Sequence, residues 1–149
     1  MNRRIGFEFR KLSILFKRNL DNSDVFKENK DLTGLQSYII GYIYKNSSIK
    51  DIYQKDIEST LTIRRSTATE ILKLMEKREL IIKTPVANDA RLKKITLTQK
   101  AIDIHKQVMN AIDKLEENMM SKLTSEELKL FFEIVDKLSI GLEERWFYD

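Results

Sequence analysis

Residues 65–97 read RSTATEILKLMEKRELIIKTPVANDARLKKITL, and the elements that they predict define the fold class. Apolar side chains recur at positions i, i+3, i+4 and i+7 near its start, at Ala68, Ile71, Leu72 and Met75. This spacing places them on one face of a helix and is the clearest amphipathic pattern in the chain. Two β-rich segments follow, 80–86 and 92–97, and the turn-forming residues 87–91 separate them. The stretch therefore predicts a helix followed by a β-hairpin, with Pro85 near the end of its strand.

The segments before this stretch predict further helices. A helix is expected over residues 5–20, where one apolar stripe recurs at helical spacing, and residues 21–31 are expected to form a polar connection. The next helix is expected over residues 34–44, because Thr33 and Gln36 match a capping box ahead of it.

A short helix near residues 54–60 and a tight turn at Thr62–Ile63 complete a helix-turn-helix pattern. After the hairpin, Thr98 is expected to cap a long helix over residues 99–122. A second capping box beginning at Thr124 starts the final helix, whose apolar residues alternate three and four apart as in a coiled coil: Leu128, Phe131, Val135, Leu138 and Leu142.

These elements predict a mainly α fold with a small β-hairpin wing, a winged helix-turn-helix joined to a helical dimerisation region. We expect an N-terminal dimerisation helix and connection over residues 1–31, a DNA-binding domain over 32–98, and C-terminal dimerisation helices over 99–149. Three long apolar stripes exceed what a small winged domain can cover, so dimerisation is favoured, and an intramolecular bundle is the alternative. The predicted dimerisation residues are Ile5, Phe9, Leu12, Leu128, Phe131, Val135, Leu138 and Leu142.

The charge of the chain is unevenly distributed. Residues 62–100 carry ten Lys or Arg and four Asp or Glu, whereas residues 101–149 carry six and eleven. A basic segment over residues 62–100 followed by an acidic segment over residues 101–149 indicates that the basic one contacts a polyanion. An uneven solvated surface is the alternative, and charge by itself favours that interpretation.

Several classes of site are disfavoured by composition. The chain has no cysteine, which excludes disulfides, thiolate metal sites and thiol redox sensing. His105 is the single histidine, so no metal or other cofactor is expected, and no catalytic motif is found, so the chain is not expected to be an enzyme. Because no apolar run approaches the roughly 20 residues that span a bilayer, no membrane partner is expected and a cytoplasmic location is predicted.

The predicted helix over residues 65–77 has a polar face suited to the major groove of double-stranded DNA. Arg65 at its start is expected to hydrogen-bond a guanine edge. Ser66 and Thr69 are expected to bond bases or phosphates, and Lys73 is expected to contact a phosphate. An ordinary surface helix is the alternative.

The hairpin carries a cluster of cations, Lys83, Arg91, Lys93 and Lys94. Arg91, beside the turn, is expected to enter a narrow minor groove, because the negative potential there attracts its guanidinium group. Asp89 would repel phosphate, so its expected role is to bond turn N–H groups or to orient Arg91. A basic edge that prevents sheet aggregation is the alternative.

The order and spacing of six segments resemble the MarR (multiple antibiotic resistance regulator) family over roughly residues 32–140. They are LTGLQ at 32–36, QKDI at 54–57, RSTAT at 65–69, LMEKRELI at 74–81, NDAR at 88–91 and LT at 97–98. The resemblance implies a homodimeric regulator, usually a repressor, that binds a pseudo-palindromic operator. Arg64, just before the predicted helix over residues 65–77, and Thr67 within it are also predicted DNA-binding residues, and Arg64 is expected to contact a phosphate.

The chain departs from the family at several positions. Arg64 stands where a small capping residue is usual, Glu70 where a basic or polar residue is common, and Glu79 where the family has a glycine before the wing. Ala101 also replaces a frequent glycine. We expect these differences to affect affinity and sequence preference more than the fold.

Many members of the family release DNA when a small molecule enters a cleft beside the dimer helices. The resemblance places Phe16, Tyr38 and Tyr42 in that region, where they would bind an aromatic effector; packed aromatic residues of a core or interface are the alternative. For the whole chain, the alternative function is a winged-helix protein-interaction module that does not bind DNA. A protein-docking wing is expected to expose apolar residues, and the cations of this one favour DNA.

Overall fold

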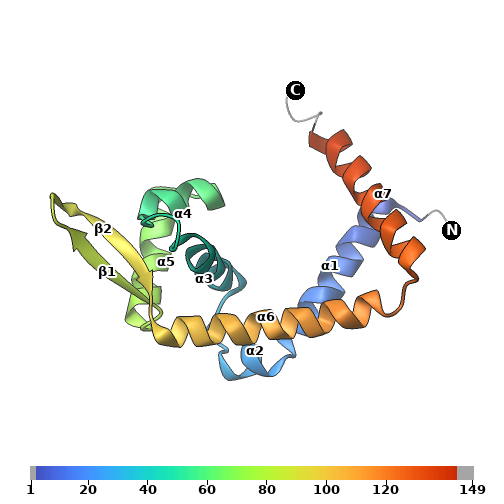
Figure 1. Cartoon of the computed structure of the whole chain (residues 1–149), viewed down its shortest axis with the longest axis horizontal. Helices are drawn as coiled ribbons and strands as arrows, with labels where there is room; N and C mark the ends of the chain where they lie inside the picture. The colour runs from blue at the N-terminus through green and yellow to red at the C-terminus, as the bar shows by residue number, and fades with distance from the viewer. Residues whose placement is uncertain (1–2, 144–149) are drawn as a thin grey trace. The chain divides into compact units, whose positions relative to one another are not determined.

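The computed structural model describes residues 3–143, which are mainly helical with one two-stranded antiparallel sheet (Figure 1). This confirms the predicted fold class. The chain forms two compact units, one ending at Ala111 and the other beginning at Ile112. The elements are α1 (Ile5–Asp21), α2 (Asp24–Glu28), α3 (Gly34–Asn46), α4 (Gln54–Leu61), α5 (Arg65–Lys77), β1 (Ile81–Val86), β2 (Asp89–Leu97), α6 (Gln99–Met120) and α7 (Ser125–Glu143).

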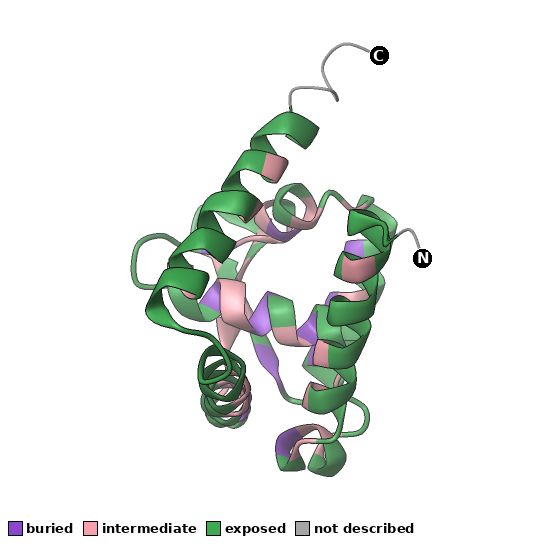
Figure 2. Ribbon diagram, turned by 90° about the vertical axis from the view of Figure 1, so that its right-hand side faces the viewer, coloured by how far each residue is buried: buried purple, intermediate pink, exposed green. Residues whose placement is uncertain are grey.

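The core of the first unit is built from α3, α4, α5, the base of the hairpin and the start of α6. Figure 2 shows its residues as the purple segments of the ribbon. Each fully buried aliphatic side chain contributes about 1.5–3 kcal/mol from removal of apolar surface from water. The largest fully buried side chains are Ile39, Ile40, Ile43, Ile52, Ile57, Leu72, Met75, Ile81 and Ile95.

Helix α3 begins as the capping box predicts. Thr33 Oγ1 accepts from the backbone N–H of Gln36 at 3.1 Å, and Gln36 Oε1 accepts from the backbone N–H of Thr33 at 3.3 Å. Gln36 is only 2% exposed, and its amide oxygen also accepts from Arg78 Nη1 at 3.3 Å. A buried polar side chain therefore joins the start of α3 to the residue that follows α5.

The predicted helix-turn-helix is formed by α4 and α5. Its turn depends on Thr62, which has a left-handed backbone with φ of 51°. The N–H of Ile63 donates to the carbonyl of Glu58 at 3.1 Å, which closes the end of α4. A left-handed conformation is costly for a β-branched residue, so this turn is strained.

We expect Thr62→Gly to raise the melting temperature. Glycine removes a conformational cost of about 1–2 kcal/mol for a left-handed L-residue, and it adds roughly 0.4–1 kcal/mol of entropy to the unfolded chain. The net gain of up to about 1 kcal/mol corresponds to about 2–4 °C, measurable by calorimetry. Thr60→Gly is the matched control within α4 and is expected to lower the melting temperature. An equal loss in both variants would contradict the strain at Thr62.

The end of α5 is also left-handed. Glu79 has φ of 58°, so it adopts the conformation for which the family uses glycine. The N–H of Leu80 donates to the carbonyl of Met75 at 2.9 Å, which makes this a Schellman end. Thr98 stabilises it, because its hydroxyl donates to the Glu79 carbonyl at 2.6 Å while accepting from the N–H of Ala101 at 3.2 Å. The predicted cap of α6 by Thr98 is thereby confirmed.

The hairpin differs from the prediction in one respect that affects the site. The turn is confined to Ala87 and Asn88, and β2 already begins at Asp89 rather than at Leu92. Pairing shifts from Pro85 opposite Lys93 to Val86 opposite Asp89, so residues 90–92 have no partner position on β1. The expectation that the turn-forming segment extends to Arg91 is therefore wrong. Arg91 lies on an irregular part of β2, because a bulge and not a longer loop absorbs the extra residues.

Two further boundaries differ from the prediction. The polar connection over residues 21–31 contains the short helix α2, because Val25 is buried and only 5% exposed. Helix α6 ends at Met120, two residues early. In the second unit the Thr124–Glu127 capping box is confirmed, with bonds of 2.8 and 3.2 Å.

Candidate nucleic-acid interface

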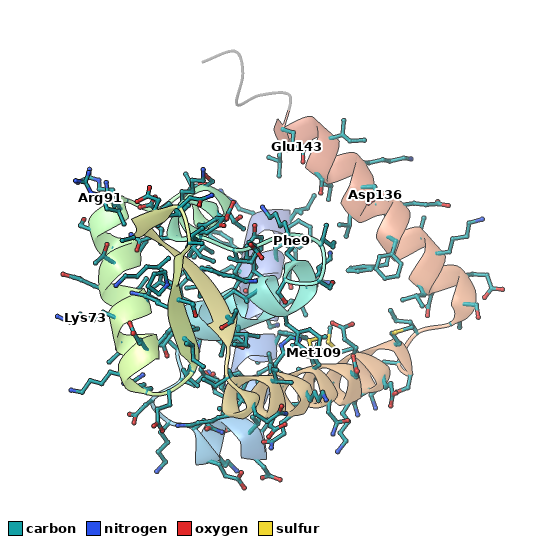
Figure 3. All side chains as sticks on the ribbon, turned by 60° about the vertical axis from the view of Figure 1, so that its left-hand side comes forward. Phe9, Lys73, Arg91, Met109, Asp136 and Glu143 are labelled. Atoms are coloured by element: carbon teal, nitrogen blue, oxygen red, sulfur yellow. The ribbon has the colours of Figure 1, made fainter. Side chains whose placement is uncertain are left out.

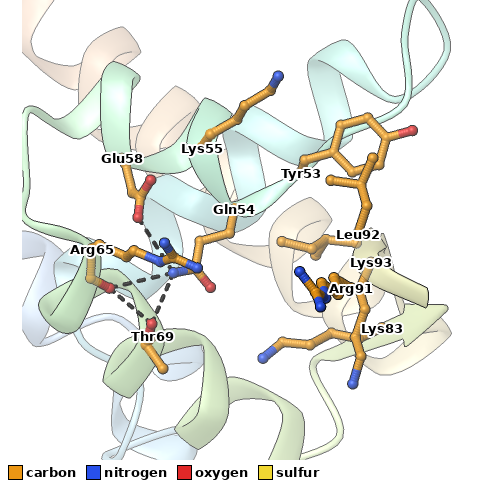
Figure 4. Close-up of a pocket in the computed structure, with 11 residues that line it drawn as sticks. Tyr53, Gln54, Lys55, Glu58, Arg65, Thr69, Lys83, Arg91, Leu92 and Lys93 are labelled. Carbon is orange, nitrogen blue, oxygen red and sulfur yellow. Dashed lines mark hydrogen bonds between the residues drawn. The ribbon is translucent and has the colours of Figure 1, made fainter. Parts of the chain in front are cut away.

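A hollow of about 380 Å³ lies between the helix-turn-helix and the wing. Figure 4 shows residues of α4 and α5 on one side of it and residues of β1 and β2 on the other. It brings together five of the predicted DNA-binding residues, Arg65, Thr69, Lys83, Arg91 and Lys93. The remaining lining residues are Tyr53, Gln54, Lys55, Glu58, Leu92 and Ile95.

The start of α5 presents a second group of predicted residues. Arg64, Ser66 and Thr67 are exposed but do not line the hollow. The helix begins after Arg64, whose side chain makes no capping hydrogen bond. The first N–H groups of α5 therefore have no cap from this side chain, and they are suitable donors for a phosphate oxygen.

Lys73 lies on the same helix, two turns beyond Arg65. Its side chain is exposed and points into solvent, as does that of Arg91 on the wing (Figure 3). Ala68, Leu72 and Met75 are fully buried on the opposite face of α5. The helix is therefore held by its apolar face while its polar face stays accessible.

The wing holds the backbone at Arg91 through a short hydrogen bond. Asp89 Oδ1 accepts from the backbone N–H of Arg91 at 2.9 Å. Asp89 makes no ion pair with the Arg91 guanidinium within the described residues 3–143. The carboxylate thus shapes the local backbone and leaves the charge of Arg91 available.

The cations of the site differ in their partners. Lys83 Nζ lies 3.5 Å from Glu76 Oε2, and Lys94 Nζ lies 2.7 Å from Asp51 Oδ1. The hydrogen bond to Asp51 raises the pKa of Lys94. In the part of the chain that the structure describes, no carboxylate within 4 Å pairs with any of Arg64, Arg65, Lys73, Arg91 and Lys93.

Sequence reasoning missed Gln54 as a site residue. It is the first residue of α4, and its Nε2 lies 2.8 Å from Thr69 Oγ1 and 3.3 Å from the Arg65 carbonyl oxygen (Figure 4). No local pattern signals this contact, because the partners are 15 and 11 residues away in the sequence. It appears only when the turn brings α4 against α5.

The predicted dimerisation residues lie on α1 and α7, neither of which has a buried residue. Ile5, Phe9 and Leu12 are exposed on α1. On α7, Leu128, Val135 and Leu138 are half-buried, and Phe131 and Leu142 are exposed. Both helices therefore present apolar surface that the single chain does not bury.

The predicted effector residues differ in exposure. Phe16 and Tyr42 are half-buried, whereas Tyr38 is 56% exposed. His105 packs against Tyr44 with ring centroids 4.6 Å apart, and burial lowers its pKa. Its ring therefore belongs to the contact between α3 and α6.

Across residues 3–143, no three or more His, Asp or Glu side chains are grouped so that they could hold a metal ion. None of the helices in that range has the length and apolarity needed to cross a membrane.

Known proteins resemble the chain in sequence and in structure. The sequence profile of the MarR family matches residues 30–92. The chain is 30% identical over 122 residues to the HTH-type transcriptional regulator YwhA of Bacillus subtilis (strain 168), which covers 82% of this chain and 84% of that protein. The MepR–DNA complex of S. aureus matches with a TM-score of 0.75 at 26% identity, over 95% of this chain and 99% of that one. S. aureus MepR bound to ethidium bromide matches with a TM-score of 0.68 at 26% identity, over 94% and 97% of the two chains.

The profile match spans the helix-turn-helix and most of the wing, and the similarity to YwhA extends well beyond both segments. The chain therefore belongs to the MarR family of winged helix-turn-helix transcription regulators.

Proposed function

We propose that the protein is a homodimeric, sequence-specific DNA-binding regulator that represses transcription until a small molecule releases it. The observation that carries the proposal is the set of unpaired cations on α5 and the wing, on both sides of one hollow. Cations without protein partners are available for phosphates and base edges. The structure of S. aureus MepR with DNA supports this use in a relative.

The cations divide into two proposed roles. Arg65 at the start of α5 and Arg91 on the wing read the DNA, in the major and minor grooves respectively. Arg64, Lys73 and Lys93 hold phosphates. Lys83 and Lys94 pair with acidic side chains, so their phosphate contacts compete with Glu76 and Asp51 and contribute less.

We propose that α1, α6 and α7 form the dimer. The proposed division is residues 1–31 and 99–149 for dimerisation and residues 32–98 for DNA binding, with residues 1–2 and 144–149 outside the described part of the chain. The support is the apolar surface left exposed on α1 and α7. Two-fold symmetry would then place two recognition helices on the half-sites of a pseudo-palindromic operator.

The proposed release by an effector is supported by the S. aureus MepR structure with ethidium bromide. In this chain the aromatic residues Phe16, Tyr38 and Tyr42 supply ring surface for such a ligand. Regulators of this family are generally non-enzymatic DNA-binding proteins, and we propose the same for this chain. A regulator of transcription acts on the chromosome, so we propose that it works in the cytoplasm.

The test is selection of bound fragments from genomic DNA, including the region upstream of the protein's own gene. A selected duplex is expected to bind with an affinity that falls steeply as salt increases, because phosphate contacts release counterions. Fluorescence anisotropy across a salt series measures this slope. If no fragment binds at low salt, the proposed function is wrong.

A further inference from the structure

The first turn of α5 lacks the usual means of fixing a helix start. Most helices begin with a side chain that caps the first N–H groups, and Arg64 makes no such bond. The preceding turn contains the strained Thr62. Besides the buried face of the helix, the position of Arg65 therefore depends on a contact from a neighbouring element.

That contact comes from α4, whose own start is firmly held. Asp56 Oδ2 accepts from the backbone N–H of Tyr53 at 2.8 Å, and Asp56 Oδ1 lies 3.2 Å from Lys50 Nζ. Ile57 in the same helix is only 1% exposed. Gln54 thus projects from a helix that is fixed both by its cap and by its core residue.

The Gln54 amide nitrogen has two hydrogen-bond acceptors on α5 and one on its own helix α4. It donates to Thr69 Oγ1 at 2.8 Å and to the carbonyl of Arg65 at 3.3 Å, and Glu58 Oε1 lies farther away at 3.4 Å. Thr69 Oγ1 itself donates to the Arg65 carbonyl at 2.8 Å. Gln54, Arg65 and Thr69 therefore form a closed triangle of hydrogen bonds, which we call the Gln54 clamp (Figure 4).

The clamp determines which acceptors the Thr69 hydroxyl group can donate to. A hydroxyl has one hydrogen, and here it is directed to the Arg65 carbonyl. Phosphate oxygens are acceptors only, so Thr69 has no hydrogen left for a phosphate unless the clamp opens. Although Thr69 is exposed to solvent, its hydroxyl group is therefore already hydrogen-bonded to another group of the protein.

We propose that Gln54 is a positioning residue for DNA recognition, and that Thr69 acts through Gln54 rather than by direct contact with DNA. The clamp leaves the first N–H groups of α5 uncapped but holds its first turn against α4, which sets where Arg65 points in the hollow. This proposal rests on the proposed function in DNA binding. It replaces the expectation that Thr69 bonds bases or phosphates.

The test is a double-mutant cycle on the affinity for the selected duplex. Gln54→Ala and Thr69→Val each break the Gln54–Thr69 hydrogen bond of the clamp and one of its two bonds to the Arg65 carbonyl, and each is expected to weaken binding about tenfold. The double variant is also expected to be about tenfold weaker, not a hundredfold, because both changes remove the same unit. Thr69→Ser keeps the hydroxyl and is expected to recover the affinity that Thr69→Val loses.

The control is Thr60→Val, which makes the same substitution as Thr69→Val at an exposed threonine of α4 and leaves the clamp intact. Its affinity is expected to match that of the unmodified protein. Additive losses in the double variant would overturn the role of Thr69 through Gln54, and normal binding by Gln54→Ala would overturn the clamp. If circular dichroism shows that Gln54→Ala does not fold, the comparison of Thr69→Val with Thr69→Ser tests the clamp instead. Equal affinity of these two variants would then overturn the proposal. If the unmodified protein binds no duplex, the proposed function fails instead.

Discussion

Replacement of Arg91 by alanine is expected to weaken operator binding by about 10- to 100-fold while the dimer mass and the melting temperature stay nearly unchanged. Arg91 is exposed and has no ion-pair partner among residues 3–143, so its loss removes no packing and no internal bond of the guanidinium. The Asp89 bond to the backbone N–H at 91 survives the change. A single well-placed base contact is worth about 1–3 kcal/mol, which gives the expected range.

The measurement is anisotropy with the selected duplex, together with calorimetry and sedimentation. Arg91→Lys keeps the charge but loses the planar fork, so it is expected to fall between the alanine variant and the unmodified protein. Lys27→Ala removes an exposed cation on α2 and is the control for a general loss of charge. A collapse of the fold in Arg91→Ala would show that Arg91 is structural.

Leu138→Glu is expected to separate the dimer and, with it, to abolish high-affinity operator binding. Leu138 is half-buried in the single chain. It belongs to the apolar stripe of α7, which we call the seam and which consists of Leu128, Phe131, Val135, Leu138 and Leu142. An unpaired carboxylate buried in an interface costs several kcal/mol, and symmetry introduces it twice. We expect the dimer dissociation constant to rise by at least about a thousandfold, which corresponds to roughly 4 kcal/mol.

Analytical ultracentrifugation at micromolar concentration measures this change. Ser139→Glu places the same charge one residue along α7, at an exposed position outside the seam, and is expected to leave the dimer intact. A dimer that survives Leu138→Glu would disprove the seam, whereas dissociation of both variants would indicate a general effect of charge on α7.

Local patterns in the sequence predicted the elements well. The apolar spacing in α5 predicts the buried face that the structure shows at Ala68, Leu72 and Met75, and Ile71, the fourth residue of the pattern, is half-buried. The capping boxes at Thr33 and Thr124 predict the helix starts because cap and partner lie three residues apart. Such features can be predicted from the sequence because the interacting groups are neighbours along the chain.

The local patterns failed where distant residues decide the structure. The start of β2 and the place of Arg91 follow from cross-strand pairing with a shifted register, which turn propensity does not report. The short helix α2 lies in a polar segment and is associated with the burial of Val25. The left-handed Glu79 goes against residue preference, and contacts from Thr98 accompany it.

Periodicity and caps in short segments were enough to predict the winged helix-turn-helix, and the order and spacing of six motifs were enough for the resemblance to the MarR family. Folding settled which cations stay unpaired, because it brings Asp51 to Lys94 and Glu76 to Lys83. It also decided that Gln54 reaches Thr69 and Arg65, because the α4–α5 turn closes a gap of 15 residues. The physical reason is that hydrogen bonds and ion pairs act over a few ångströms in space, whatever the separation along the chain.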